Sequence, residues 1–172
     1  AHFEHNRRSQ WGILSASSVI PLPEYYHTTG DLLKHVDISE LKSTKGDLIS
    51  LEEIKLLSPI TRNQQFVCQG ANYRQHMIDS GVDPDAKNFN MIFTKAPSCI
   101  VPADSPVIIP NHVRLLDYEA ELGLVIRREI TGQIKVTEQN LHEFIAGLVV
   151  VNDYSARDIQ IPEMQFYKGK SY

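Results

Sequence analysis

The chain has 172 residues, of which 42% are hydrophobic and 22% are charged, and its formal net charge is −4. This length is enough for one good core, or for a small domain with part of another. The composition is ordinary for a soluble globular protein, and the acidic balance gives no reason to expect nucleic acid or an anionic membrane as a partner. No apolar run is long enough to span a bilayer.

Cysteine use favours a reducing compartment. Cys68 and Cys99 are far apart in the sequence and form no C-x-x-C pair. Isolated cysteines of this kind are most simply small hydrophobic residues of a protein without disulfides. The first eight residues lack an apolar signal core. We therefore predict a cytoplasmic protein.

The first 62 residues are predicted to form a small N-terminal α+β domain. Residues 11–14 and 18–20 are short strand-like pieces, and residues 29–36 have the pattern of a short amphipathic helix with a polar start. A spacing typical of a capping box predicts a further short helix over residues 50–57. None of these segments carries chemistry by itself.

From residue 63 onward, apolar strands are predicted to end in polar clusters. Strands are predicted over residues 65–70 and 91–93. The intervening residues 79–90 are rich in Asp, Gly, Pro and Asn, so they are predicted to form a loop that could act as a lid beside a site.

Three more strands and a helix are predicted in the second half of the chain. The strands cover residues 107–109, 122–126 and 148–151, and the helix covers residues 137–145 with a threonine as its N-cap. The last two strands are apolar enough to be buried. The final one leads directly into the polar residues 152–160, and polar residues at the end of a buried strand are where sites are usually built.

Two carboxylates stand at the start of the strand that ends at Ile126. Glu119 and Glu121 are spaced i, i+2, so they leave the same strand face, roughly 7 Å apart at Cα. Carboxylates held this close repel each other unless a positive charge lies between them, and a hard divalent cation would supply it. Asp153 could be a third ligand, and an all-oxygen set favours Mg²⁺, with Mn²⁺ or Ca²⁺ as substitutes. Paired acids on a strand also occur on solvated faces, so the spacing alone leaves both interpretations open.

Several bases and cations accompany these acids. His76 and Asp79 are spaced i, i+3, so a helical turn would let the carboxylate orient the imidazole, which could then activate water. An exposed loop histidine is the alternative. Arg157, Gln160 and Lys170 could hold an anionic substrate or stabilise an oxyanion, or they could be ordinary solvated side chains. The sequence contains no motif of serine hydrolases, kinases or dinucleotide-binding enzymes.

Five sequence blocks occur in a definite order: residues 70–73 with His76, 93–98, 117–122, 152–160 and 169–172. Their residues, order and spacing resemble the fumarylacetoacetate hydrolase superfamily. The resemblance implies an α+β, mostly β fold, in which a mixed β-roll or sandwich catalytic domain over residues 63–172 follows the N-terminal domain of residues 1–62. The family pattern continues past Lys170, so we expect the catalytic domain to be incomplete at its C-terminus in this chain.

The resemblance also implies a role for each candidate residue. Glu119, Glu121 and Asp153 match the metal-binding carboxylates of the family, whose metal is usually Mg²⁺. His76 matches its general base, and Asp79 stands where relatives often carry a glutamate as the partner of that base. The remaining matched positions are one further catalytic residue, Lys170, and four residues that are expected to bind or surround the substrate: Tyr73, Lys95, Arg157 and Gln160.

By the same resemblance, we expect a metal-dependent hydrolase that cleaves a carbon–carbon bond in a β-diketo acid, such as an acylpyruvate, fumarylpyruvate or fumarylacetoacetate, during aromatic compound catabolism. The same metal site could instead serve a decarboxylase, or an isomerase or hydratase, acting on 2-oxo or hydroxy-dienoate acids. A non-catalytic binding protein is the other alternative. The expected partners are a small 2-oxo or diketo acid and a second copy of the chain in a homodimer, with no nucleic acid and no membrane.

Overall fold

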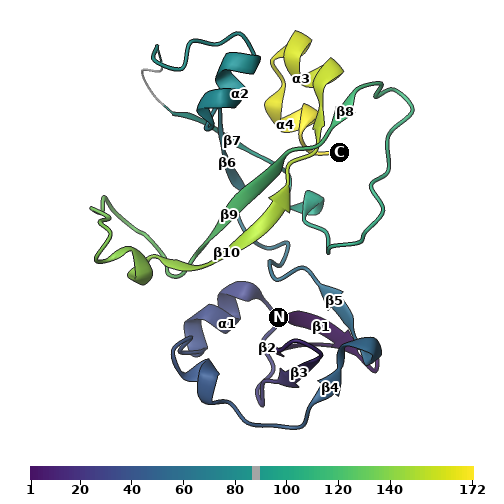
Figure 1. Cartoon of the computed structure of the whole chain (residues 1–172), viewed down its shortest axis with the longest axis vertical. Helices are drawn as coiled ribbons and strands as arrows, with labels where there is room; N and C mark the ends of the chain where they lie inside the picture. The colour runs from purple at the N-terminus through teal and green to yellow at the C-terminus, as the bar shows by residue number, and fades with distance from the viewer. Residues whose placement is uncertain (87–89) are drawn as a thin grey trace. The chain divides into compact units, whose positions relative to one another are not determined.

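The computed structural model describes residues 1–86 and 90–172, and its elements are mostly strands with a few short helices (Figure 1). This confirms the predicted α+β, mostly β class. The chain divides into two compact units, each built from three segments. Unit 1 consists of Ala1–Gln64, Ile100–Pro106 and Ala120–Asn152, and unit 2 consists of Gln65–Cys99, Val107–Glu119 and Asp153–Tyr172. The predicted domains, 1–62 and 63–172, stay a prediction.

An antiparallel five-stranded sheet in the spatial order β4-β3-β2-β1-β5 forms the first part of unit 1 (Figure 1). Phe3, Trp11 and Val19 pack in its core and are at most 4% exposed. Gly12 permits the close approach of β2 and β3, because a Cβ at this position would lie 2.6 Å from the carbonyl oxygen of Ile20. The strands are β1 (His2–His5), β2 (Arg8–Leu14), β3 (Ser18–Pro21), β4 (Ile49–Ser50) and β5 (Lys55–Leu57).

The helix predicted over residues 29–36 is confirmed as α1 (Thr29–His35). Thr28 is its N-cap, because the Thr28 hydroxyl accepts a hydrogen bond from the Asp31 N–H at 3.0 Å. This bond satisfies one of the backbone donors that the start of a helix leaves without an intrahelical partner. A short 3₁₀ helix, η1 (Glu40–Ser43), follows α1.

The prediction of a helix over residues 50–57 is wrong. Ser50 caps only a 3₁₀ turn, η2 (Leu51–Glu53), where its hydroxyl accepts a hydrogen bond from the Glu52 N–H at 3.3 Å. The chain then continues as β5, which pairs with β1. Hydrogen bonds to a neighbouring strand thus outweigh the local helical preference, which is a weak determinant over so few residues.

The strands predicted over residues 122–126 and 148–151 are confirmed as β9 (Ala120–Ile126) and β10 (Ile145–Asn152), an antiparallel ribbon of unit 1 (Figure 1). The prediction that both strands are buried is wrong for one face of the ribbon. A run of apolar residues shows that a strand is suited to burial. It does not show whether another element packs on that face, because this depends on the tertiary structure. The apolar side chains on this face are 54–87% exposed: Leu122, Leu124, Leu148 and Val150.

The prediction of a helix over residues 137–145 is also wrong. The Thr137 N–H donates to the Asn140 side-chain oxygen at 2.7 Å, so this local hydrogen bond closes a turn instead of capping a helix. Short polar side chains commonly compete with helix formation in this way. Only a 3₁₀ turn, η4 (Leu141–Glu143), precedes β10.

Unit 2 contains two short antiparallel strand pairs, β6 with β7 and β8 with β11. The first pair confirms the strands predicted over residues 65–70 and 91–93. The strand predicted over residues 107–109 is wrong: these residues form no strand, and Ile108 is 82% exposed. A proline on either side of them removes backbone donors that a sheet would need. The strands are β6 (Val67–Gly70), β7 (Met91–Thr94), β8 (Leu116–Asp117) and β11 (Ser155–Ala156).

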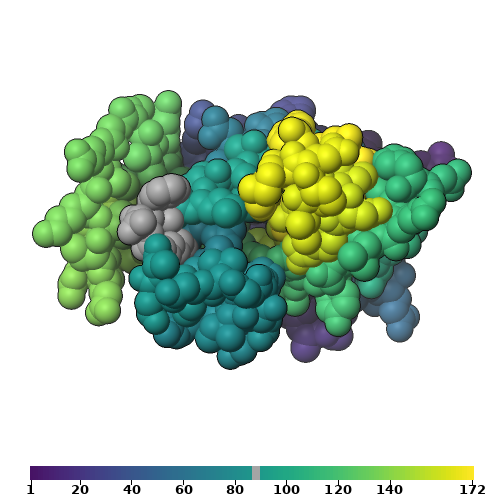
Figure 2. Space-filling view, turned by 90° about the horizontal axis from the view of Figure 1, so that it is seen from above, coloured from purple at the N-terminus to yellow at the C-terminus, as the bar shows by residue number. Residues whose placement is uncertain are grey.

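The two C-terminal helices of unit 2 pack closely against each other, and the second of them, α4, also packs against β7. Gly169 makes this possible, because a Cβ there would lie 2.8 Å from the Cβ of Gln160. The rings of Phe93 and Phe166 lie 5.6 Å apart, and Figure 2 shows the C-terminal residues in yellow beside teal residues from an earlier segment of the same unit. The helices of this unit are α2 (Arg74–Asp79), η3 (Pro97–Cys99), α3 (Arg157–Glu163) and α4 (Phe166–Gly169).

The predicted lid, residues 79–90, includes residues 87–89, which lie outside the described residues. Its role as a lid stays a prediction. Across residues 1–86 and 90–172, no helix has the length and hydropathy that crossing a bilayer requires.

Candidate metal centre

Pairing of β9 with β10 places the predicted acidic residues side by side. The two strands are antiparallel, with Ala120 opposite Asn152, so the start of β9 lies beside the end of β10. A further backbone hydrogen bond, from the Asp153 N–H to the Glu119 carbonyl oxygen at 2.8 Å, extends this pairing past the strand ends. As a result, Glu119, Glu121 and Asp153 each offer one carboxylate oxygen, and these oxygens lie within 4.8 Å of one another.

Two buried lysines hold the Asp153 carboxylate. Asp153 is 7% exposed, and Lys95 and Lys170 are 5% and 4% exposed. Lys95 Nζ donates to Asp153 Oδ1, and Lys170 Nζ donates to Asp153 Oδ2 at 2.8 Å. Lys95 Nζ also donates a hydrogen bond to the Tyr154 carbonyl oxygen at 3.3 Å. Charged groups this deeply buried require partners of opposite charge, and each ammonium group here has one.

The Glu119 carboxylate is held through one of its oxygens, Oε1. Ser155 Oγ lies 2.5 Å from it, Lys170 Nζ 2.6 Å and Arg157 Nη2 3.0 Å. Burial by itself raises the pKa of Glu119, but the hydrogen bonds from Lys170 and Ser155, together with the charges of Lys170 and Arg157, outweigh it. The pKa of Glu119 therefore lies below its ordinary value, and the carboxylate is ionised at neutral pH.

Arg157 joins this cluster to the start of α3. Its Nε and Nη2 atoms donate to Asp117 Oδ2 at 3.0 and 2.8 Å, and its Nη1 donates to Gln160 Oε1 at 2.9 Å. Asp117, Gln160 and Glu119 therefore hold the guanidinium group from different sides, because its donors form a rigid fork. Gln160 is 6% exposed and lies one turn farther along the same helix. The structure thus brings both predicted residues of α3 into one hydrogen-bonded group.

The donor set fits a hard divalent cation. Its three potential ligands are all carboxylates, which Mg²⁺, Mn²⁺ and Ca²⁺ prefer over softer ligands. Three cationic side chains, Lys95, Lys170 and Arg157, contact Glu119 or Asp153. Because Arg157 also pairs with Asp117, the group holds four carboxylates and three cations, and its formal net charge is −1. A dication bound to a group with this negative charge leaves an excess of positive charge, which an anionic ligand would offset.

The remaining predicted residues lie on or before α2. Tyr73 precedes this helix and is 49% exposed, and His76 lies within it. Asp79 Oδ1 accepts a hydrogen bond from Gln75 Nε2 at 2.8 Å. In the part of the chain that the structure describes, no hydrogen bond or ion pair joins His76 to Asp79. The catalytic roles of both residues stay predictions, and the helix gives Asp79 a different partner.

The cluster contains two further residues: Ser155, for which the sequence predicts no role, and Asp117, for which it predicts a supporting part beside Glu119 and Glu121. Asp117 orients Arg157, and Ser155, which is fully buried, contacts both Glu119 and Lys170. The position of Ser155 could have been predicted from its spacing. Residues spaced i, i+2 along an extended chain lie on the same side, and Ser155 follows Asp153 at this spacing.

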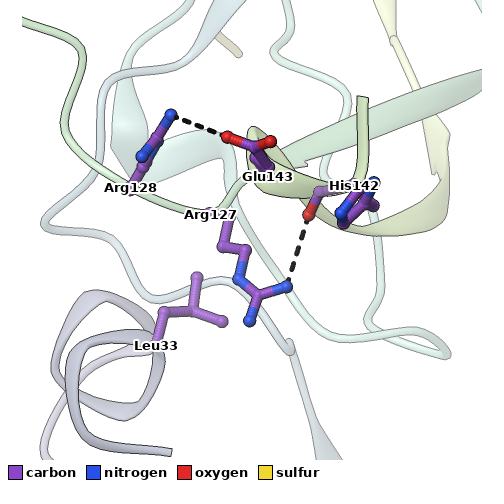
Figure 3. A pocket seen from close by; sticks show the side chains of 5 residues that line it. All are labelled: Leu33, Arg127, Arg128, His142 and Glu143. Carbon is purple, nitrogen blue, oxygen red and sulfur yellow. Dashed lines mark hydrogen bonds and ion pairs between the residues drawn. The ribbon is translucent and has the colours of Figure 1, made fainter. Parts of the chain in front are cut away.

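A separate surface hollow of about 400 Å³ lies in unit 1 (Figure 3). Two of its side chains are already engaged: Arg127 Nη1 donates to the His142 carbonyl oxygen at 3.3 Å, and Arg128 Nη2 donates to Glu143 Oε2 at 3.3 Å. The hollow contains none of the predicted site residues. Its lining consists of Leu33, Arg127, Arg128, His142 and Glu143.

Curated relatives match nearly three quarters of the chain. Oxaloacetate tautomerase YisK of Bacillus subtilis (strain 168) is 35% identical over 128 residues, which are 72% of this chain and 41% of that protein. The mitochondrial oxaloacetate tautomerase fahd2 of Xenopus laevis is 35% identical over 127 residues, covering 73% of this chain and 38% of the relative. The chain thus spans about two fifths of the length of these relatives.

Solved structures of similar fold cover nearly the whole chain. A fumarylacetoacetate hydrolase from Exiguobacterium antarcticum is 29% identical, with a TM-score of 0.72, over 99% of this chain and 61% of that protein. A 2-hydroxyhepta-2,4-diene-1,7-dioate isomerase from Mycobacterium marinum, 21% identical, has a TM-score of 0.73 over 99% of this chain and 60% of its own, and shows the same fold. The family model described as fumarylacetoacetate (FAA) hydrolase C-terminal matches residues 65–172. With its fold and its sequence in agreement, the chain belongs to the fumarylacetoacetate hydrolase family.

Proposed function

We propose that this protein is a divalent-cation-dependent enzyme that interconverts the keto and enol forms of a small 2-oxo acid, with oxaloacetate as the first candidate substrate. The observation that carries the proposal is the group of three carboxylates, Glu119, Glu121 and Asp153, surrounded by buried cations. Support for the reaction comes from relatives at 35% identity that are named oxaloacetate tautomerases.

Glu119, Glu121 and Asp153 are the residues that would hold the cation, and we propose Mg²⁺, with Mn²⁺ or Ca²⁺ able to substitute. When bound, the cation supplies Lewis-acid polarisation of the 2-oxo group and so favours loss of a proton from the adjacent carbon. Substrate binding and proton transfer are then proposed for other side chains.

The cationic side chains are proposed to attract and orient the substrate. Lys95, Lys170 and Arg157 place three positive charges next to the carboxylates, and Lys95 and Lys170 are shielded from water. Positive charge at a site with little solvent stabilises a dicarboxylate and the negative charge that develops during enolisation. Gln160 and Tyr73 are proposed to contact the substrate, as the family resemblance implies.

His76 is proposed to move the proton at the carbon next to the 2-oxo group. An imidazole ring nitrogen can accept a proton and donate it again, which suits a base that must both remove and return a proton. Tautomerisation removes a proton from this carbon and adds one to the 2-oxo oxygen, or the reverse, and breaks no carbon–carbon bond. It does not require the activated water that hydrolysis needs.

The second candidate is hydrolysis of a carbon–carbon bond in a β-diketo acid. The solved fumarylacetoacetate hydrolase at 29% identity favours it. This reaction also passes through an enolate, but it needs a base that activates water. The predicted partner of that base, Asp79, is hydrogen-bonded to Gln75. We therefore place hydrolysis second, and decarboxylation of oxaloacetate can be measured in the same assays.

Three assays separate these activities. Decay of the enol absorbance of oxaloacetate measures tautomerisation, loss of acetylpyruvate absorbance measures hydrolysis, and release of carbon dioxide measures decarboxylation. We expect the protein with Mg²⁺ to accelerate the first, chelator to stop it, and Glu119→Gln to lower it strongly. Glu143→Gln is the matched control, because Glu143 is exposed and pairs with Arg128 away from the carboxylates. Mg²⁺-loaded protein that leaves the enol decay at its spontaneous rate would refute the proposal.

We also propose a homodimer, on the family resemblance alone, and a cytoplasmic setting, on the two isolated cysteines. Light scattering tests the assembly: a mass near one chain would contradict the dimer.

A further inference from the structure

Ser155 stands at the centre of the polar cluster without a role in the chemistry proposed above. It lies in β11 and is 0% exposed. Its Oγ lies 2.5 Å from Glu119 Oε1, 2.7 Å from Lys170 Nζ and 3.1 Å from the Asp153 carbonyl oxygen. A buried hydroxyl therefore links two of the proposed cation ligands to the lysine between them.

The number of available protons fixes the direction of these hydrogen bonds. An ammonium group has three protons, and Lys170 Nζ has three oxygen partners: Glu119 Oε1, Asp153 Oδ2 and Ser155 Oγ. Ser155 therefore accepts a hydrogen bond from Lys170. Its own single proton then goes to an acceptor, and the shorter of its two acceptor contacts is the one to Glu119 Oε1.

Each of these bonds restricts a side chain that would otherwise rotate. The bond to Oε1 limits rotation of the Glu119 carboxylate, and the bond from Lys170 keeps the ammonium between Glu119 and Asp153. Alanine at position 155 would remove both restraints and would leave one Lys170 N–H without its buried acceptor. Groups that hold metal ligands in place usually affect metal affinity nearly as much as the ligands do.

We propose that Ser155 is a positioning residue, whose hydroxyl orients the Glu119 carboxylate and the Lys170 ammonium so that the carboxylates can hold a divalent cation. The inference rests on the cation site of the proposed function. It assigns Ser155 no contact with the substrate.

Titration of the full chain with Mn²⁺ tests this role, with free Mn²⁺ followed by electron paramagnetic resonance. Ser155→Ala should weaken Mn²⁺ affinity about 10- to 100-fold, as loss of a group that holds a metal ligand typically does. Ser171→Ala is the matched control, because Ser171 Oγ accepts a hydrogen bond from the Ala96 N–H and contacts none of the carboxylates. This control should retain the wild-type affinity.

A second variant covers the case in which Ser155→Ala does not fold. Ser155→Cys keeps a side chain of similar size but replaces the hydroxyl with a weak donor, so it should fold and still bind Mn²⁺ less tightly than the wild type. Thermal unfolding in chelator identifies the folded variants before titration.

The outcomes separate this inference from the proposed function. Tight Mn²⁺ binding by the wild type and by Ser171→Ala, with weak binding by folded Ser155 variants, supports it. Folded Ser155 variants that bind as tightly as the wild type overturn it and leave the proposed function standing. A wild-type chain that binds no Mn²⁺ overturns both.

Discussion

Lys170 Nζ lies 2.8 Å from Asp153 Oδ2, and neither side chain is more than 9% exposed. The other oxygen of Asp153 accepts a hydrogen bond from Lys95, so a single buried carboxylate is shared by two ammonium groups. Such an arrangement is stable only while all of its charges are present, because removal of one partner leaves an uncompensated charge in a region with little water. The side chains that stabilise the fold here are therefore the same ones that are proposed to take part in the chemistry.

Lys170→Met should strongly destabilise the protein. The substitution keeps most of the side-chain volume but removes the ammonium that balances Glu119 and Asp153. Loss of one partner of a buried pair typically lowers the free energy of unfolding by about 3–5 kcal/mol. Urea unfolding measures the change. Lys168→Met is the control, because Lys168 lies in α4, two residues before Lys170, and its pair with Glu163 is exposed, so the loss should stay below about 1 kcal/mol. Equal losses in the two variants would contradict the prediction.

The contribution of Glu119 to stability should vanish in acid. Its pKa is lower in the folded protein than in the unfolded chain, so the stabilisation is complete above the unfolded value and is lost as pH falls through the folded one. Urea unfolding of the wild type and of Glu119→Gln, in chelator, should show a constant difference in unfolding free energy above the ordinary glutamate pKa of about 4.3, and a shrinking difference below it. A difference that does not change with pH would show that the ionised form is not the stabilising one.

Gly169→Ala should disturb the packing of α3 against α4. The new Cβ would lie 2.8 Å from the Cβ of Gln160 and 2.9 Å from its backbone, so one of the two helices must move. Overpacking of this kind costs about 1–3 kcal/mol of unfolding free energy. Gly132→Ala is the control, since nothing lies within 4 Å of a Cβ there. Denaturant unfolding of both variants checks the prediction, and an unaffected Gly169→Ala would argue against tight packing of the helices.

Mg²⁺ should raise the unfolding temperature of the wild type but not that of Glu121→Gln. A cation that binds only the folded protein stabilises it by an amount that rises with the ratio of cation concentration to Kd, and Glu121 supplies one of the three carboxylates. Differential scanning fluorimetry with increasing Mg²⁺ measures the shift. Glu143→Gln, which changes an exposed glutamate in a surface ion pair, should respond as the wild type does. A full Mg²⁺ response in Glu121→Gln would remove Glu121 from the ligand set.

Local pattern predicted some elements well and others poorly. The helix after Thr28 and the strands at residues 91–93 and 122–126 were predictable, because a cap or a run of apolar residues lies within a few positions. The helices predicted over residues 50–57 and 137–145 failed. In the first, strand pairing with β1 outweighed the helical preference, and in the second, Asn140 closed a turn.

The sequence by itself determined the family, the acidic residues and the positive charges that accompany them, because these depend on residue type and order along the chain. Only the tertiary structure decided how they meet: the pairing of β9 with β10 brings Asp153 beside Glu119, and the C-terminal helices bring Lys170 between them. It also gave Ser155 and Asp117 their partners. These contacts join residues up to 51 positions apart, and local spacing carries no information about such distances.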